Sequence, residues 1–219
     1  WGWHMADQSI VDVFEEGDPR RDETLLYFST PSKPWPAIAP ATGNAPFNEF
    51  LVSQDGLDGD YYNKKAYCSP KLREYYGSNG GFWYNIRMIR YSDVVLMAAE
   101  AACEMGGEAM IEEALDYLEQ VRARARGTNT NVLPKVTTTN QLELCKAIHH
   151  ERHVELALEF DRFYDLVRWQ EFSIAGAEDG ASAVLGNKGY TAKNKYLPLP
   201  QEQVDASNGV LVQNPDYAN

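Results

Sequence analysis

Residues 89–101 read IRYSDVVLMAAEA, and their pattern gives the first indication of the fold class. Its apolar positions recur at the three- and four-residue spacing of a helix that buries one face. The pattern continues to residue 105, where the pair Gly106-Gly107 is typical of a helix end. We therefore expect a helix over residues 87–105. Its apolar stripe would consist of Ile89, Val94, Leu96, Met97, Ala101 and Met105.

A second amphipathic segment begins directly after these glycines. Residues 108–126 place apolar side chains on one helical face, and Gly127 ends the pattern. Two helices joined by about two residues form an antiparallel αα-hairpin, which is the repeating unit of helical solenoids. The expected buried face consists of Ile111, Ala114, Leu115, Leu118 and Val121.

A third helix is expected over residues 141–172, bent or broken near Phe160. Its buried side would consist of Leu142, Cys145, Ile148, Leu156, Phe160, Phe163 and Val167. Together the three segments predict a mainly α fold built from helix pairs.

The flanking regions are rich in Pro, Gly, Asn and aromatic residues. Residues 1–85 are expected to form long loops, with a short helix at Ile10–Glu16 and a proline-rich, extended arm at residues 30–46. Residues 173–219 return to loops and contain the rigid strap YLPLP at residues 196–200. The fold class is therefore mainly α with long loops and few short strands.

Charge and composition exclude several classes of protein. The 219 residues carry 20 Lys and Arg against 32 Asp and Glu, a formal net charge of -12, which opposes binding to nucleic acid. We find no run of about 18 apolar residues that would predict a membrane span. Cys68, Cys103 and Cys145 are far apart and lack zinc-ligand spacing, so we assign them no chemistry and expect buried thiols at Cys103 and Cys145.

His149 and His153 stand four residues apart, the spacing that places two zinc ligands on one helical face. A zinc protease of the HExxH type needs its glutamate directly after the first histidine. Here His150 occupies that position and Glu151 follows it. The pattern therefore favours satisfied or exposed histidines, and no metal site is predicted.

The same helix carries a row of charged residues. A glycosidase needs two carboxylates facing each other across a cleft, which residues stacked along one helix do not provide. Spacings of three and four with interleaved arginines instead predict a network that pins this helix to its neighbours. The row comprises Glu151, Arg152, Glu155, Glu159, Asp161, Arg162, Asp165 and Arg168.

The acidic turn DGLDGD at residues 55–60 is similar in composition to a calcium loop, but its ligand spacing departs from the EF-hand. A solvated turn is the expectation, no cofactor is predicted, and calcium support of the loops is left open. Motifs for nucleophilic serine or for phosphate binding are missing from the sequence. The standard sequence signatures of these two kinds of catalytic site are therefore not found.

Aromatic residues outside the helices suggest a binding role. A sugar ring stacks its C–H face on a flat aromatic ring while its hydroxyls bond to nearby polar side chains. The alternative is that these rings pack the long loops onto the scaffold. The candidate glycan-binding residues are Trp1, Trp3, Trp35 and Trp83.

Several motifs, in order, resemble the SusD/RagB family of outer-membrane nutrient-binding lipoproteins. Residues 89–101 are similar to that family's iRyaDvlLmyAEA helix, and GDPR at residues 17–20 to its turn of the same sequence. The segments 121–125, VRARA, and 151–169, ERHVELALEFDRFYDLVRW, resemble further family motifs. The tail YLPLPQ at 196–201 and QNP at 213–215 completes the resemblance.

The resemblance implies a SusD-like α–α superhelix of tetratricopeptide-like helix pairs. It implies non-catalytic binding of oligosaccharides at the cell surface, with delivery to a SusC-like TonB-dependent transporter in the outer membrane. The signal and lipid anchor would lie outside these residues, because family members are more than twice this length. A helical protein-docking scaffold, or a peptide-binding member of the family, remains the alternative.

In this interpretation the chain has three regions. Residues 1–85 form a ligand-facing region rich in loops and aromatic residues, and residues 86–172 form the helical core. Residues 173–219 form a C-terminal strap and loops of the same domain. The expected partners are an oligosaccharide and the transporter, and neither nucleic acid nor direct membrane contact is expected.

Overall fold

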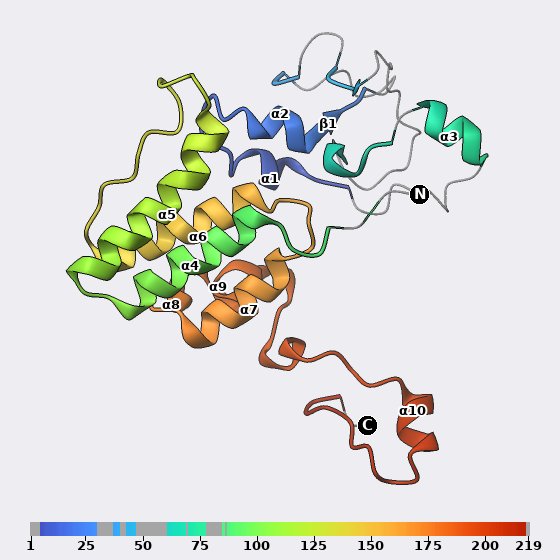
Figure 1. Cartoon of the computed structure of the whole chain (residues 1–219). Coiled ribbons are helices and arrows are strands. Elements are labelled where there is room, and N and C mark those ends of the chain that lie inside the picture. Colours follow the sequence, from blue (N-terminus) through green and yellow to red (C-terminus); the bar gives the residue numbers. More distant parts are fainter. Residues whose placement is uncertain are drawn as a thin grey trace. The chain divides into compact units, whose positions relative to one another are not determined.

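The computed structural model describes residues 5–29, 37–39, 43–46, 61–68, 70–77, 85 and 87–217. The fold is mainly α-helical, as the sequence predicts, and the described residues form one two-stranded sheet (Figure 1). Two compact units follow one another, residues 1–162 and 163–219. The three regions expected from the sequence have boundaries that differ from those of these two units, and they stay a prediction.

The elements of the first unit occur in the following order. They are α1 (Gln8–Val11), α2 (Arg20–Thr24), β1 (Leu25–Tyr27), β2 (Tyr61–Asn63), the 3-10 helix η2 (Lys64–Ala66), α3 (Pro70–Tyr76), α4 (Tyr91–Met105), α5 (Glu108–Arg126) and α6 (Gln141–Glu155). The next elements are α7 (Arg162–Phe172), α8 (Gly176–Asp179), α9 (Ala181–Leu185), η3 (Gly186–Lys188), η4 (Ala192–Lys195) and α10 (Gln201–Ala206).

Helices α4, α5 and α6 pack together and form the scaffold of the first unit (Figure 1). Helix α5 has the predicted bounds, and four of its five predicted core residues are buried, whereas Leu115 is half-buried. The turn between α4 and α5 uses Gly106 at φ 68° and Gly107 at φ 86°, backbone conformations that side chains other than glycine rarely adopt. The predicted αα-hairpin is thereby confirmed.

Helix α4 differs from its prediction in its start and in its buried face. It begins at Tyr91 rather than residue 87, because Arg90 has an extended backbone and uses its guanidinium to pair with acidic residues of α6 and the following turn. Of the predicted stripe, Leu96 is buried, whereas Ile89, Val94, Met97, Ala101 and Met105 are exposed. The face toward the other helices instead contains two acids, Asp93 and Glu100, beside Arg152.

The predicted third helix is broken as expected near Phe160. Helix α6 ends at Glu155 and α7 begins at Arg162, and between them Leu158 and Phe160 have positive φ angles of 62° and 75°. The predicted buried side holds at Cys145, Ile148 and Leu156. It is wrong at Leu142, Phe160 and Phe163, which are exposed.

The segment before the scaffold helices contributes its own small core. The expected helix at Ile10–Glu16 is displaced to Gln8–Val11, because Asp7 accepts a hydrogen bond from the Ser9 amide and so caps an earlier start. Strands β1 and β2 pair antiparallel, with Leu26 opposite Tyr62. The shared core joins this segment to α6 and consists of Ala6, Val11, Phe14, Leu25, Tyr27, Tyr61, Val154 and Ala157.

The second unit has a separate core around Leu166, Trp169 and Ala181. Gly176 lies so close to α7 that an added Cβ would sit 2.2 Å from the Trp169 carbonyl oxygen, which excludes larger residues there. The predicted strap is tied to the chain end, because Gln213 accepts from the Leu199 amide and donates to its carbonyl oxygen.

Candidate functional site

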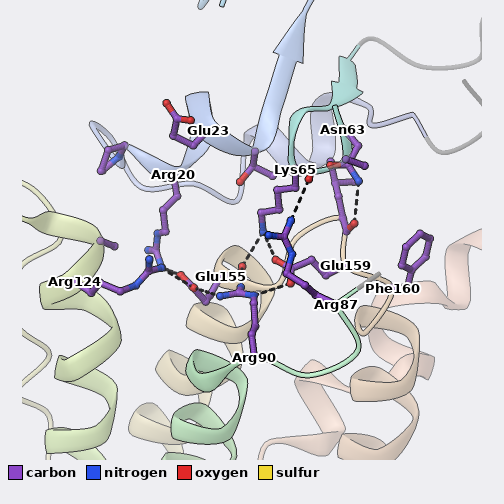
Figure 2. A pocket seen from close by; sticks show the side chains of 15 residues that line it. Arg20, Glu23, Asn63, Lys65, Arg87, Arg90, Arg124, Glu155, Glu159 and Phe160 are labelled. Carbon is purple, nitrogen blue, oxygen red and sulfur yellow. Dashed lines mark hydrogen bonds and ion pairs between the residues drawn. The ribbon is translucent and has the colours of Figure 1, made fainter. Parts of the chain in front are cut away.

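A pocket of about 610 Å³ opens in the first unit where the ends of several elements meet (Figure 2). It is lined from α2, β2 and η2 on one side, and from the ends of α5 and α6 on the other. Most of the lining residues are charged or polar, and Phe160 contributes a ring that is 66% exposed. The lining includes Arg20, Glu23, Asn63, Lys65, Arg87, Arg90, Arg124, Glu155, Glu159 and Phe160.

Glu155 is the carboxylate on which this wall is organised. Arg90 donates to its Oε1 at 2.6 Å, Arg124 donates to the same oxygen at 2.7 Å, and Arg20 donates to Oε2 at 3.1 Å. Burial raises the pKa of Glu155, but the arginines, Arg90 foremost, more than offset it, so the pKa is lowered. The carboxylate is therefore held ionised and cannot donate a proton near neutral pH.

Glu159 and Lys65 form the second charged group of the pocket. Lys65 donates to Glu159 Oε1 at 2.6 Å and to the carbonyl oxygens of Glu155 and Ala157 at the end of α6. Burial lowers the pKa of Lys65 although Glu159 opposes this. Arg90 donates to the other oxygen of Glu159, and these two cations keep the pKa of Glu159 below its ordinary value against its burial.

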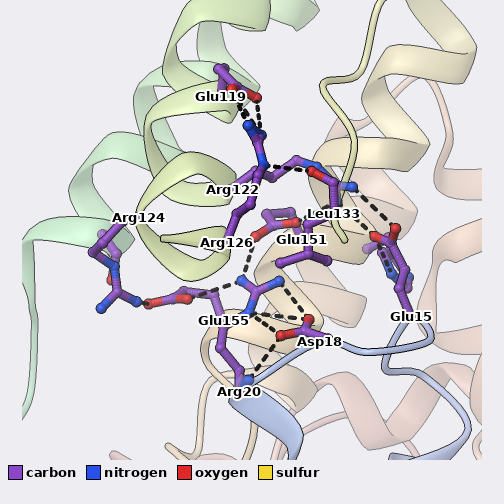
Figure 3. A network of polar contacts seen from close by, with 12 residues as sticks. Glu15, Asp18, Arg20, Glu119, Arg122, Arg124, Arg126, Leu133, Glu151 and Glu155 are labelled. Carbon is purple, nitrogen blue, oxygen red and sulfur yellow. Dashed lines mark hydrogen bonds and ion pairs between the residues drawn. The ribbon is translucent and has the colours of Figure 1, made fainter. Parts of the chain in front are cut away.

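Beneath the pocket lies a network that connects the amino-terminal segment to α5 and α6 (Figure 3). Arg20 binds Asp18 through both Nε and Nη2 and also reaches Glu151. The second oxygen of Glu151 accepts from Arg122 at 3.0 Å, and Arg122 continues to Glu15 at 2.7 Å. The Glu151 side chain is fully buried, so it is accommodated as an ion by two arginines.

This geometry confirms that the charge row pins α6 to its neighbours. Glu151, Arg152, Glu155 and Glu159 each pair with a residue from another element. Glu155 and Glu159 are each bonded to cations that keep them ionised, so neither is suited to act as the general acid of a glycosidase. The side chains that line the pocket offer fixed hydrogen-bond donors and acceptors, which suit the recognition of hydroxyl and carbonyl groups.

The predicted glycan-binding residues Trp1, Trp3, Trp35 and Trp83 lie outside the described residues, as does the acidic turn at residues 55–60. The one tryptophan of the described part, Trp169, is buried in the core of the second unit. Phe160 was missed as a pocket residue because the helical pattern assigned its ring to the buried side. The predicted break near Phe160 was the available signal.

The two histidines of the predicted helix are in different surroundings. His149 is 2% exposed and lies 3.5 Å from the thiol of Cys145, one turn earlier on α6. His153 is half-buried, and burial, together with Arg162 and His150, lowers its pKa to about 3. Among the described residues, His149 and His153 do not form a metal-ligand cluster with each other.

Comparison with known proteins assigns the chain to a family. The model of the SusD family matches residues 4–217. The chain belongs to the SusD family. SusD-like protein P2 of Formosa agariphila is 31% identical over 226 residues, covering 99% of this chain and 41% of the relative. SusD-like protein P38 of the same organism is 38% identical, over 73% of this chain and 35% of the relative.

A solved structure of a SusD homolog has the same fold as this chain. A SusD homolog from Bacteroides thetaiotaomicron aligns over 96% of this chain and 42% of its own length, with a TM-score of 0.53 and 21% identity. The chain thus spans less than half the length of the relatives it matches. Within the described residues, no helix is both long and apolar enough to cross a membrane.

Proposed function

We propose that the protein binds oligosaccharides without chemical conversion, as the capture component of a glycan-uptake system. The observation that carries the proposal is the match of the SusD family model over residues 4–217. In this role it would act at the outer surface of the outer membrane and pass its ligand to a SusC-like TonB-dependent transporter. Arg90 holds both Glu155 and Glu159 in ion pairs, which supports a role of this pocket in binding.

The pocket at Phe160 offers a place for one sugar unit of the ligand. The exposed ring can stack on the C–H face of a pyranose. Arg87 and Arg124 are exposed at the same pocket, and Glu23 supplies an acceptor, so hydroxyl groups of the sugar can bond around the ring.

Calorimetric titration of the protein with a panel of neutral and acidic oligosaccharides tests the proposal. Phe160→Ala and Arg87→Ala should each lower the affinity for the recognised glycan at least tenfold. Phe172→Ala removes an exposed ring of the second unit and Lys188→Ala an exposed cation, and both should leave the affinity unchanged. Equal affinity in all four variants would remove the pocket from the site, and a panel without any binding would reject the proposal.

A second candidate, docking of a partner protein, is favoured by one observation. Met88 and Ile89, before α4, are 80% and 68% exposed, and Tyr91, Val94 and Met97 of α4 are exposed as well. Such a row of large apolar side chains is typical of a protein contact. Co-purification with the transporter tests this surface, and Met97→Asp should abolish it. Glycan affinity distinguishes the two roles, because a docking scaffold would co-purify with the transporter but bind no oligosaccharide.

A further inference from the structure

Three potential metal ligands from two helices meet in the interior of the first unit. Glu104 lies in the last turn of α4, whereas Cys145 and His149 lie one turn apart on α6. Their ligand atoms all lie within 4.8 Å of one another. The Cys145 thiol is 3.4 Å from Glu104 Oε1 and 3.5 Å from His149 Nε2. Cys145 and His149 are buried, and Glu104 is half-buried.

The two distances from the Cys145 sulfur match the edges of a metal coordination shell. Zinc binds thiolate sulfur at about 2.3 Å and imidazole nitrogen or carboxylate oxygen at about 2.0–2.2 Å in a tetrahedron. Two ligand atoms of such a tetrahedron are therefore about 3.4–3.8 Å apart. A thiolate, an imidazole and a carboxylate form a donor set that zinc prefers over calcium or magnesium, which bind oxygen.

The local sequence explains why the three side chains converge. Positions 145 and 149 are four residues apart, so both side chains leave α6 on the same face. The end of α4, which carries Glu104, is held against the start of α6 because Gln141 donates to the carbonyl oxygen of Cys103 at 2.7 Å. The Cys103 thiol donates to the Gln141 carbonyl oxygen at 3.4 Å and also contacts the Cys145 thiol, but it is not one of the three ligand atoms that lie close together. Glu104 is half-buried and gives the cluster a side toward solvent.

We propose that Glu104, Cys145 and His149 bind one divalent cation of the zinc class, which clamps the end of α4 to α6. Binding converts the Cys145 thiol into a thiolate and releases its proton to solvent, so affinity rises with pH in the range where the thiol is protonated. Neutral His149 supplies a ring nitrogen, and ionised Glu104 supplies an oxygen. A water molecule from the half-buried Glu104 side completes the shell. This site is independent of glycan binding.

Metal titration of the whole chain tests the site. The protein is purified under reducing conditions, stripped with a chelator, and titrated with Zn²⁺ against a chromophoric competitor. One equivalent should bind, and Cys145→Ser and His149→Gln should each weaken binding at least 100-fold. Cys68→Ser removes the third cysteine and His150→Gln the next histidine of the same helix, so these matched controls should bind as tightly as the unaltered chain.

Cobalt gives a readout that does not depend on whether the variants fold. Co²⁺ bound to the unaltered chain should show a thiolate-to-cobalt charge-transfer band and the visible bands of a tetrahedral ion, and Zn²⁺ should displace it. Absence of the charge-transfer band overturns the proposal, as does unchanged binding in Cys145→Ser. Mass spectrometry that finds Cys145 disulfide-bonded to Cys103 in the protein from its cells would overturn it as well.

Discussion

Arg20 donates a hydrogen bond to Glu151 across 131 positions of sequence, and the carboxylate that it reaches is fully buried. The other oxygen of Glu151 is bonded to Arg122 of α5. One carboxylate therefore connects the amino-terminal segment, α5 and α6. Because a buried carboxylate is stable only while its arginine partners remain, the stability of the fold should depend strongly on Glu151.

Glu151→Gln should lower the free energy of unfolding by about 3 kcal/mol, because it leaves two arginines facing a neutral amide in the interior. Urea denaturation measures the change. Glu112→Gln, at an exposed position of α5, should alter stability by less than about 0.5 kcal/mol. A loss below about 1 kcal/mol for Glu151→Gln would show that the ion pair contributes little to stability.

The protein should become less stable in acid because of Glu155 and Glu159, whose pKa values are lowered in the folded state. The unfolded chain then binds more protons than the folded one at these two carboxylates, so their contribution to stability is complete above about pH 5 and falls as the pH drops below the ordinary value of 4.5. Urea midpoints measured between pH 6 and pH 3 check this. Stability that rises below pH 4.5 would contradict the lowered pKa values.

His153 should add a loss of stability at milder pH. Its pKa is lowered from 6.5 to about 3. Below pH 6.5 this imidazole is therefore protonated in the unfolded chain but stays neutral in the folded chain. The free energy of unfolding should therefore fall by up to about 1.4 kcal/mol per pH unit as the pH decreases from 6.5 toward 4.5. His153→Gln should flatten this part of the profile, whereas His150→Gln should retain it.

Gly106 and Gly107 offer a matched pair for the turn between α4 and α5. Both have positive φ, but a Cβ at Gly106 would lie 2.8 Å from Gln141 Nε2, whereas a Cβ at Gly107 meets nothing within 4 Å. Gly107→Ala should cost about 1–2 kcal/mol of stability from backbone strain, and Gly106→Ala should cost more. Thermal unfolding of the two variants measures the difference, and equal costs would mean that Gln141 moves aside freely.

Phe160→Gly should separate stability from binding. Phe160 has φ 75°, a conformation that costs about 1–2 kcal/mol for a side chain other than glycine, while glycine loses about 0.5–1 kcal/mol through chain entropy. Stability should therefore change by less than about 1 kcal/mol. Glycan affinity should nevertheless fall at least tenfold because the stacking ring is gone. Unfolding of the variant would show that the ring is structural.

The sequence predicted correctly those helices whose apolar residues and end signals lie within their own segment. Helix α5 has the predicted bounds because its apolar spacing and its flanking glycines agree. For α4 the same reasoning selected the wrong face, since Asp93 and Glu100 read as solvent-exposed although Arg152 of α6 makes their burial possible. Hydrophobic spacing cannot indicate a buried acid whose partner lies on another element.

The site was predictable only in part for the same reason. The charge row on α6 indicated a network, but its arginine partners come from residues 20, 90, 122 and 124. The pocket exists because these distant segments meet, and spacing along one helix does not encode that meeting. Likewise, the four-residue spacing of Cys145 and His149 was visible, but Glu104 joins them through the packing of α4 on α6.

The separation of Arg20 and Glu151 along the sequence also determines the order in which parts of the protein can fold during synthesis. A ribosome adds about 5–20 residues per second, so the 131 residues between Arg20 and Glu151 take about 7–26 s to translate. During that interval strand β1, whose three residues are fully buried in the finished protein, has emerged without α6 to cover it. The amino-terminal segment can therefore complete its folding only after α6 has been made.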